Sequence, residues 1–482
     1  MRIVRGVLVA TTCALLGACA VGPNYKRPAF DVAAAYKEQD GWKPSEPNDA
    51  LDRGAWWEIY NDPVLNGLEA QINISNQNVL AAAASVEEAR ALLRQAQAGF
   101  WPSVSLNASR TRTVQGTGSG TGTILGTGSG TGGTILGNNT TSTVNDLGIS
   151  GNWEIDLWGR IRRTTESDRA SMQASEAALA GARLSAQATL ATDYFELRAQ
   201  DQLQIILNDI VAAEQLSLKI TENRYRVGVA AKADVVSAQT QLLSSQADQA
   251  NAPLQRAILE HAIAVLTGQQ PANFSLPTAV MRKDVPTVPA GMPSTLLERR
   301  PDVAQAERQV AASNAQIGVQ ISAFFPTLDI TGSDDYRGNT ISHLIRTANR
   351  VWAIGPSLAL TVFDAGLRRA QVAQARASHE ATVDNYRQTV LTSLEQVEDD
   401  IVTLRVLEQR AVIEDAAVKA AREAETLTLN QYKAGTVPYS SVITAQTTRL
   451  NAEETDLNVL SSRLQGSVAL IQALGGGWKA AH

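Results

Sequence analysis

The sequence predicts a fold of long α-helices combined with membrane β-strands, built from a strand–strand–long helix–helix unit that occurs twice in the chain. Three observations predict it. Short motifs recur at a constant spacing, two long proline-free stretches carry apolar residues at helical spacing, and segments of alternating polarity come before each of these stretches.

The internal repeat is visible in matching glycine motifs. Gly159 in Leu-Trp-Gly-Arg matches Gly366 in Asp-Ala-Gly-Leu, and Gly228 in Tyr-Arg-Val-Gly matches Gly435 in Tyr-Lys-Ala-Gly. Each pair lies 207 residues apart (366 − 159 and 435 − 228). Upstream, Pro102 matches Pro326 at a spacing of 224 (326 − 102), so the first copy carries 17 extra residues (224 − 207). The chain is therefore a tandem duplication.

The N-terminus has the features of a secretion signal. Arg2 and Arg5 precede a short apolar stretch that ends at Leu-Gly-Ala-Cys, with Cys19 last, and this stretch is too short for a membrane-crossing helix. Leu-Gly-Ala-Cys resembles the bacterial lipobox, which implies cleavage after residue 18 and an N-acyl and diacylglycerol lipid, palmitate included, on Cys19. The alternative is a small residue that happens to end a signal peptide. No other cofactor is expected.

A Gly/Thr-rich segment, 115–143, accounts for the extra length of the first copy. Gly-Thr-Gly-Ser-Gly-Thr-Gly occurs twice in it, which predicts a flexible loop. A phosphate-binding glycine loop is the alternative, but no lysine follows and no helix is predicted behind it.

Each copy contains a helical hairpin. From Gly159 to Gly228 and from Gly366 to Gly435 the chain lacks proline and repeats apolar residues at helical spacing, which predicts helices of roughly 100 Å. A second helix follows each tip glycine. Abundant alanine would let neighbouring helices pack closely, although an extended coiled coil could use alanine for its helix propensity alone.

Period-two segments precede each long helix and predict four strands, at about 103–114, 144–156, 327–336 and 352–363. Four strands cannot close a barrel, and open sheet edges are not viable in lipid. Closure must come from other subunits, and three chains would supply twelve strands.

Composition excludes several function classes. A net charge of −6 argues against nucleic-acid binding. The four histidines show no metal-ligand spacing, and no cysteine pair or nucleophile motif occurs in a suitable context, so no metal site and no enzyme activity are expected. Asp399 and Asp400, beside Glu398, are adjacent on a helix and point in different directions, which favours a solvated or tunnel-facing acidic patch over a catalytic pair.

A family resemblance rests on motifs spread along the mature chain. Glu298-Arg299-Arg300-Pro301-Asp302-Val303 and Phe324-Phe325-Pro326, together with Trp56-Trp57 and Tyr25-Lys26-Arg27-Pro28, resemble TolC-like outer membrane efflux lipoproteins of the NodT type. The resemblance implies a homotrimer with a 12-stranded β-barrel in the outer membrane, continuous with a periplasmic α-helical barrel. It implies a passive exit duct for small molecules in a tripartite efflux pump, lipid-anchored in the cell outer membrane.

The same resemblance implies partners. An RND-type inner-membrane transporter would supply energy, and a periplasmic adaptor (membrane fusion protein) would dock on the hairpin tips, marked by Gly228 and Gly435. Arg226 and Lys433 stand beside these turns and either meet adaptor groups or complement helix dipoles.

The periplasmic gate is the least determined part. In some relatives a Leu and an Asp after the second tip close the duct, but Ser440 and Thr444 occupy those positions here. Asp234, after the first tip, is a further gate candidate or a helix cap. Gate chemistry, cargo and the role of the Gly/Thr loop stay open.

The predicted organisation has six parts in chain order: signal peptide 1–18; lipid-anchored segment and equatorial belt 19–60; first repeat 61–268; Pro-rich equatorial linker 269–301; second repeat 302–475; C-terminal tail 476–482. Two other classes remain as alternatives. A periplasmic adaptor would carry one hairpin and no membrane strands, and a coiled-coil lipoprotein would carry its strands as soluble decoration.

Overall fold

The computed structural model describes residues 20–30, 36–37, 54–115, 140–288 and 300–476. These fall into two compact units. The first comprises Met1–Lys26, Ala91–Arg169 and Ala311–His379, and the second Arg27–Arg90, Ala170–Val310 and Glu380–His482.

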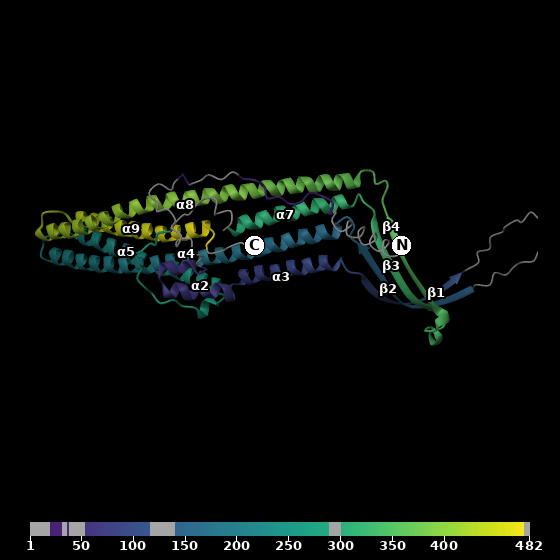
Figure 1. Cartoon of the computed structure of the whole chain (residues 1–482). Coiled ribbons are helices and arrows are strands. Elements are labelled where there is room, and N and C mark those ends of the chain that lie inside the picture. Colours follow the sequence, from purple (N-terminus) through teal and green to yellow (C-terminus); the bar gives the residue numbers. More distant parts are fainter. Residues whose placement is uncertain (1–19, 31–35, 38–53, 116–139, 289–299, 477–482) are drawn as a thin grey trace, which may run out of the picture. The chain divides into compact units, whose positions relative to one another are not determined.

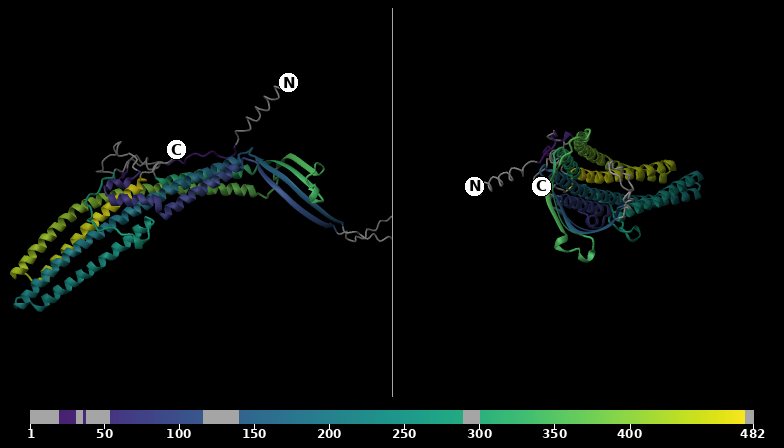
Figure 2. Two further views of the ribbon diagram at one scale, coloured as in Figure 1. Left: turned by 90° about the horizontal axis from the view of Figure 1, so that it is seen from below. Right: turned by 90° about the vertical axis from the view of Figure 1, so that its right-hand side faces the viewer.

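The first unit contains one antiparallel sheet with strand order β1-β2-β3-β4. The strands are β1 (Ser103–Gln115), β2 (Thr140–Ile155), β3 (Thr327–Gly338) and β4 (Arg350–Ala359), and they run side by side in Figure 1 and Figure 2. Strands from both copies of the repeat thus form a single sheet, through the pairing of β2 with β3.

Backbone pairing with the neighbouring strand, more than the alternation of polar and apolar residues, determines where each strand ends. Segment 352–363 was expected to be a strand, but β4 stops at Ala359, because its neighbour β3 begins at Thr327, which is the partner of Ala359. At the other end, β2 begins at Thr140 instead of 144, because Thr140–Val144 pair with Thr111–Gln115. The remaining Gly/Thr segment, 116–139, lies outside the described residues.

Aspartates cap the two junctions at which a strand passes into a long helix. Asp156 accepts hydrogen bonds from the backbone N–H groups of Ile161 (3.1 Å) and Arg162 (2.9 Å) at the start of α4. Asp364 accepts from the N–H groups of Gly366 (3.0 Å) and Arg368 (3.3 Å) at the start of α8. These bonds satisfy helix donors that lack a partner within the helix.

The helices keep the spacing of the repeat. In chain order they are α2 (Pro63–Ser75), α3 (Gln77–Ala98), α4 (Arg160–Arg226), α5 (Lys232–Leu266), α7 (Pro301–Ser322), α8 (Leu367–Ala434) and α9 (Tyr439–Ala473). The long helices α4 and α8 have 67 and 68 residues, and α5 and α9 both have 35. Each copy therefore ends in a hairpin of one long and one shorter helix.

The core of the second unit lies where the N-terminal helices meet the hairpins. Trp56, Trp57 and Tyr60 of the short helix η2 (Trp56–Tyr60) are buried with Tyr194 and Phe195 of α4. At the junction of α2 and α3, Asn76 caps α3 through its Oδ1 and donates from Nδ2 to the carbonyl of Leu266 at 2.8 Å. The N-terminal helices are thereby fastened to the end of α5.

Candidate functional site

The sheet of the first unit has one apolar face. Residues that pair in register share a face, so Leu106, Ile149, Asp334 and Trp352 form one row across the four strands. The next row, towards the helices, includes Val104 and Ile354. The described chain leaves this face uncovered: Leu106 is 71% exposed and Ile354 is 72% exposed. An apolar sheet face left open to solvent is typical of a membrane strand.

The opposite face is polar and hollowed. A cavity of about 300 Å³ is lined by small polar side chains, among them Ser103, Ser105, Ser150, Asn152 and Ser333. Farther from the helices, Arg337 on this face forms an ion pair with Asp146 at 2.5 Å. The sheet therefore has one polar face and one apolar face.

Tight turns form the hairpin tips, which lie in the second unit and end next to each other (Figure 1). Gly228 and Gly435 both have φ of +79°, a conformation that L-residues with a Cβ rarely adopt. The N–H of Gly228 donates to the carbonyl of Tyr225, and that of Gly435 to the carbonyl of Tyr432, both at 2.9 Å. These bonds satisfy carbonyls at the helix C-termini.

One arginine joins the two tips. Arg224, in the last turn of α4, donates from Nη1 to the carbonyl of Lys433 at 2.8 Å, and its guanidinium lies 4.8 Å from the ring centre of Tyr432. Tyr432 packs with Tyr439 and Val442 in a small buried cluster. Sequence reasoning missed Arg224. The only signal was a difference between the copies, since the equivalent position in the second copy is Gln431.

The predicted tip and gate residues lie close to this contact. The side chains of Arg226, Lys433, Ser440 and Thr444 are exposed. Asp234 lies in the first turn of α5, where its Oδ2 accepts the N–H of Ala231 at 3.3 Å. Asp234 thus holds a capping hydrogen bond within its own hairpin, and Ala231 is the N-cap residue.

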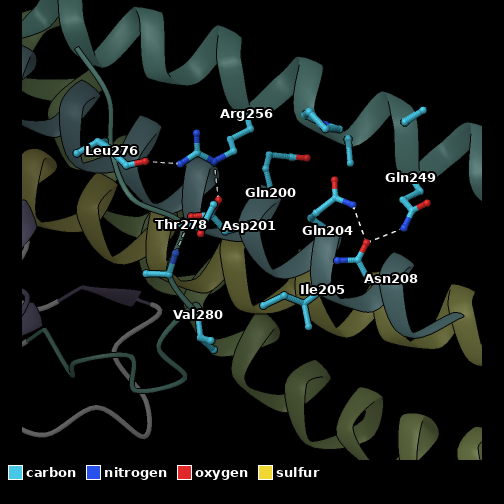
Figure 3. Close-up of a pocket in the computed structure, with 14 residues that line it drawn as sticks. Gln200, Asp201, Gln204, Ile205, Asn208, Gln249, Arg256, Leu276, Thr278 and Val280 are labelled. Atoms are coloured by element: carbon cyan, nitrogen blue, oxygen red, sulfur yellow. Dashed lines mark hydrogen bonds and ion pairs between the residues drawn. The ribbon is translucent and has the colours of Figure 1, made fainter. Parts of the chain in front are cut away.

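A cavity of about 890 Å³ lies between α4, α5 and residues 276–280 of the Pro-rich segment (Figure 3). Arg256 forms an ion pair with Asp201 at 2.6 Å and donates to the carbonyl of Leu276 at 2.6 Å. Asp201 also accepts from Arg198 and from the N–H of Ala279. These charged groups are engaged with one another and with the backbone, so they fasten the segment to the helices.

The acidic side chains on α8 differ in their surroundings. Burial, followed by the nearby charge of Asp399, raises the pKa of Asp400 to about 6. Glu398 accepts the N–H of Lys37 at 2.7 Å. Among the described residues, no group of His, Cys, Asp and Glu side chains could hold a metal ion.

Two further observations concern the membrane. None of the helices in the described ranges combines the length and apolar character that a transmembrane helix requires. Cys19, the predicted lipidation site, lies outside the described residues.

The family model for outer membrane efflux proteins matches residues 69–269 and 292–476. The chain belongs to the outer membrane efflux protein family. The two matched stretches contain the two helical hairpins, and together they also include all four strands.

Relatives and solved structures agree with this membership. The chain is similar to the probable efflux pump outer membrane protein TtgC of Pseudomonas putida (28% identity, 98% of this chain, 95% of the relative). It is also similar to the pyoverdine export outer membrane protein OpmQ of Pseudomonas aeruginosa (29% identity, 98% and 97%). The structure of the outer-membrane channel OprN superposes with a TM-score of 0.85 at 31% identity, covering 95% of this chain and all of the other.

This outer membrane efflux protein is the outer membrane channel, and hence the exit duct, of an efflux pump. The family is one of transport conduits and indicates no catalytic function. The resemblance of the sequence motifs to TolC-like outer membrane efflux proteins is confirmed.

Proposed function

We propose that three copies of this chain form one continuous passive duct, with a 12-stranded β-barrel in the outer membrane and an α-helical barrel in the periplasm. The observation that carries the proposal is the two-faced sheet, apolar and exposed on one side and polar and hollowed on the other. Within the described residues, its edge strands β1 and β4 each pair on one side only. Because unpaired backbone groups are costly in lipid, neighbouring sheets must join edge to edge.

The parts between barrel and hairpins form an equatorial belt in this proposal. Segments 19–60, 269–301 and 476–482 would surround the middle of the duct. The ion-pair network of Arg198, Asp201 and Arg256 supports this role for the Pro-rich segment, because it fastens that segment to α4 and α5.

For the periplasmic end we propose a gate at the hairpin tips. The bond from Arg224 to the Lys433 carbonyl would hold the two hairpins of one subunit together in the closed state. Ser440, Thr444 and Asp234 remain the candidates for narrowing the entrance. Their side chains are polar and small, so this constriction would seal less firmly than an apolar ring.

The partners proposed are a periplasmic adaptor, docking on the tips around Arg226, Gly228, Lys433 and Gly435, and an RND-type inner-membrane transporter. The exposure of Arg226 and Lys433 supports docking. We further propose that Cys19 carries the N-acyl and diacylglycerol anchor in the outer membrane, that no other cofactor is bound, and that the chain has no enzyme activity. Incorporation of labelled palmitate, lost in Cys19→Ser, tests the anchor.

The duct is tested by measuring oligomeric mass in detergent and conductance in a planar bilayer on the same preparation. We expect a trimer with low, intermittent conductance. Arg224→Ala should raise the time-averaged conductance several-fold, because it removes the bond between the hairpins. Arg226→Ala is the matched control, since this neighbouring arginine is exposed and forms no hydrogen bond or ion pair within the described chain.

A monomer that never conducts would contradict the duct and return attention to the adaptor and coiled-coil alternatives. A conducting trimer in which Arg224→Ala and Arg226→Ala behave alike would keep the duct but remove Arg224 from the gate.

A further inference from the structure

Two arginines interrupt the apolar face of the sheet on strand β1, just before Val114 near its end. The side chains of Val104, Leu106 and Ala108 alternate along one face of β1, and the next two positions on that face are Arg110 and Arg112. Both arginines are exposed. An arginine pair thus directly continues an apolar stripe.

No carboxylate in the described sheet neutralises these two side chains. Arg110 pairs in register with Asn145, and Arg112 with Thr143. Asp146, the neighbouring acid on β2, lies on the opposite face and is paired with Arg337. On the apolar face Asp334 is paired with Arg350, at 2.8 Å. Within the described residues, Arg110 and Arg112 have no hydrogen bond or ion pair.

Their height on the strand corresponds to a membrane boundary. From Val104 to Arg110 is six residues, which is roughly 20 Å along a strand. Because barrel strands tilt by roughly 40°, Arg110 stands only ~15 Å and Arg112 ~20 Å above Val104. Their long side chains extend the remaining distance towards the end of an apolar band that is ~25 Å tall. They lie at the end of the sheet opposite α3 and α4, which is the extracellular rim in the orientation proposed above.

We propose that Arg110 and Arg112 bind the phosphate groups of a lipid in the outer leaflet, whose acyl chains lie along Leu106, Ala108 and Ile149. The guanidinium fork matches phosphate oxygens in two-point contacts. The continuous apolar stripe beside the arginines favours an amphiphile over a free anion, because a free phosphate would leave this stripe without a partner. The proposal rests on the barrel orientation given under the proposed function.

Native mass spectrometry of the full-length protein in detergent, titrated with bisphosphorylated lipid A, tests this site. Arg110→Gln/Arg112→Gln should lower the apparent affinity on the order of tenfold, since each basic side chain at a membrane surface adds attraction to anionic lipid. Arg110→Lys/Arg112→Lys should keep most of the binding. Arg94→Gln/Arg376→Gln is the matched control, because it removes two exposed arginines from α3 and α8 in the same unit.

Two further probes identify the source of the phosphate. Lipid A from which phosphatase has removed the phosphate groups should bind the wild type as weakly as bisphosphorylated lipid A binds the glutamine variant. Inorganic phosphate, at the same concentration as the lipid, should not displace bisphosphorylated lipid A. Equal binding of both lipid forms, wild-type affinity in the glutamine variant, or full competition by inorganic phosphate would overturn the proposal.

The same spectra separate this site from the duct. The spectra give the number of chains in the complex independently of the bound lipid. A complex that is not a trimer, but still binds lipid through Arg110 and Arg112, would reject the trimer and support the lipid site. Unchanged bilayer conductance of the glutamine variant, compared with wild type, verifies that the variant is folded.

Discussion

At the scale of single residues, Glu69 is the most unusual group in the described chain. It lies in α2 with 0% of its surface exposed, and neither carboxylate oxygen has a hydrogen-bond partner among the described residues. Burial raises the pKa of Glu69 to about 9. At neutral pH the folded state therefore holds this carboxyl in its protonated form.

The sign of the resulting pH dependence follows from linkage. Unfolded chains release the Glu69 proton near pH 4.5, whereas the folded state keeps it up to about pH 9. The contribution of Glu69 to stability is thus complete below pH 4.5 and is lost as pH rises towards 9. We expect Glu69→Gln to remove a decline of about 5 kcal/mol between pH 5 and 9, because each unit of pKa shift corresponds to about 1.4 kcal/mol.

Thermal unfolding of the solubilised protein across this pH range measures the effect of Glu69. Glu88→Gln, at an exposed position on α3, serves as the control and should leave the slope unchanged. A wild-type slope in Glu69→Gln would show that the carboxyl is already ionised or is solvated in the folded protein.

At the scale of elements, the hairpin tips depend on backbone conformation. A Cβ at Gly228 would meet no atom within 4 Å, so the positive φ is the only obstacle to a side chain there. Gly67, inside α2, also has open space around a Cβ, but it is not among the positive-φ residues.

Alanine should therefore act in opposite directions at these two glycines. Gly228→Ala should destabilise the protein by about 1 to 2 kcal/mol, the cost of left-handed backbone for an L-residue. Gly67→Ala should stabilise it by about 0.5 to 1 kcal/mol, as expected in a helix interior. Chemical denaturation of both variants checks the pair, and a stabilised Gly228→Ala would mean that the tip adopts another conformation in solution.

The sheet contains a second matched pair of glycines on its polar face. A Cβ at Gly148 would approach the Cα of its register partner Asp335 to 2.8 Å, whereas a Cβ at Gly355 meets nothing within 4 Å. Gly148→Ala should lower the temperature at which the trimer dissociates in sodium dodecyl sulfate, and Gly355→Ala should leave it nearly unchanged. Equal effects would indicate that strands β2 and β3 pair in another register.

At the scale of the whole molecule, one chain supplies a sheet with two open edges. Cysteine pairs distinguish closure between subunits from closure within one chain, because β1 and β4 are at opposite edges. We expect Ser105→Cys, combined in turn with Ala353→Cys, Gly355→Cys or Ser357→Cys, to give covalently linked trimers on oxidation in at least one combination.

The control for this cross-linking is Ser105→Cys with Ser150→Cys. These residues are register partners whose hydroxyl oxygens lie 3.4 Å apart, so their disulfide forms within one chain and leaves a monomer band on denaturing gels. If every β1–β4 combination formed its disulfide within one chain and ran as a monomer, closure by neighbouring subunits would be contradicted.

The sequence by itself determined the duplication, the long helices, the tip glycines, the alternating strands and the family. Each of these is encoded in local periodicity or in a short motif, which neighbouring residues specify without help from distant ones. Only the tertiary structure decided the rest. The end of β4 at Ala359, the bond from Arg224 to Lys433 and the complete burial of Glu69 all depend on which segments meet after folding. Such contacts join positions separated by tens to hundreds of residues, and no periodic pattern along the chain specifies them.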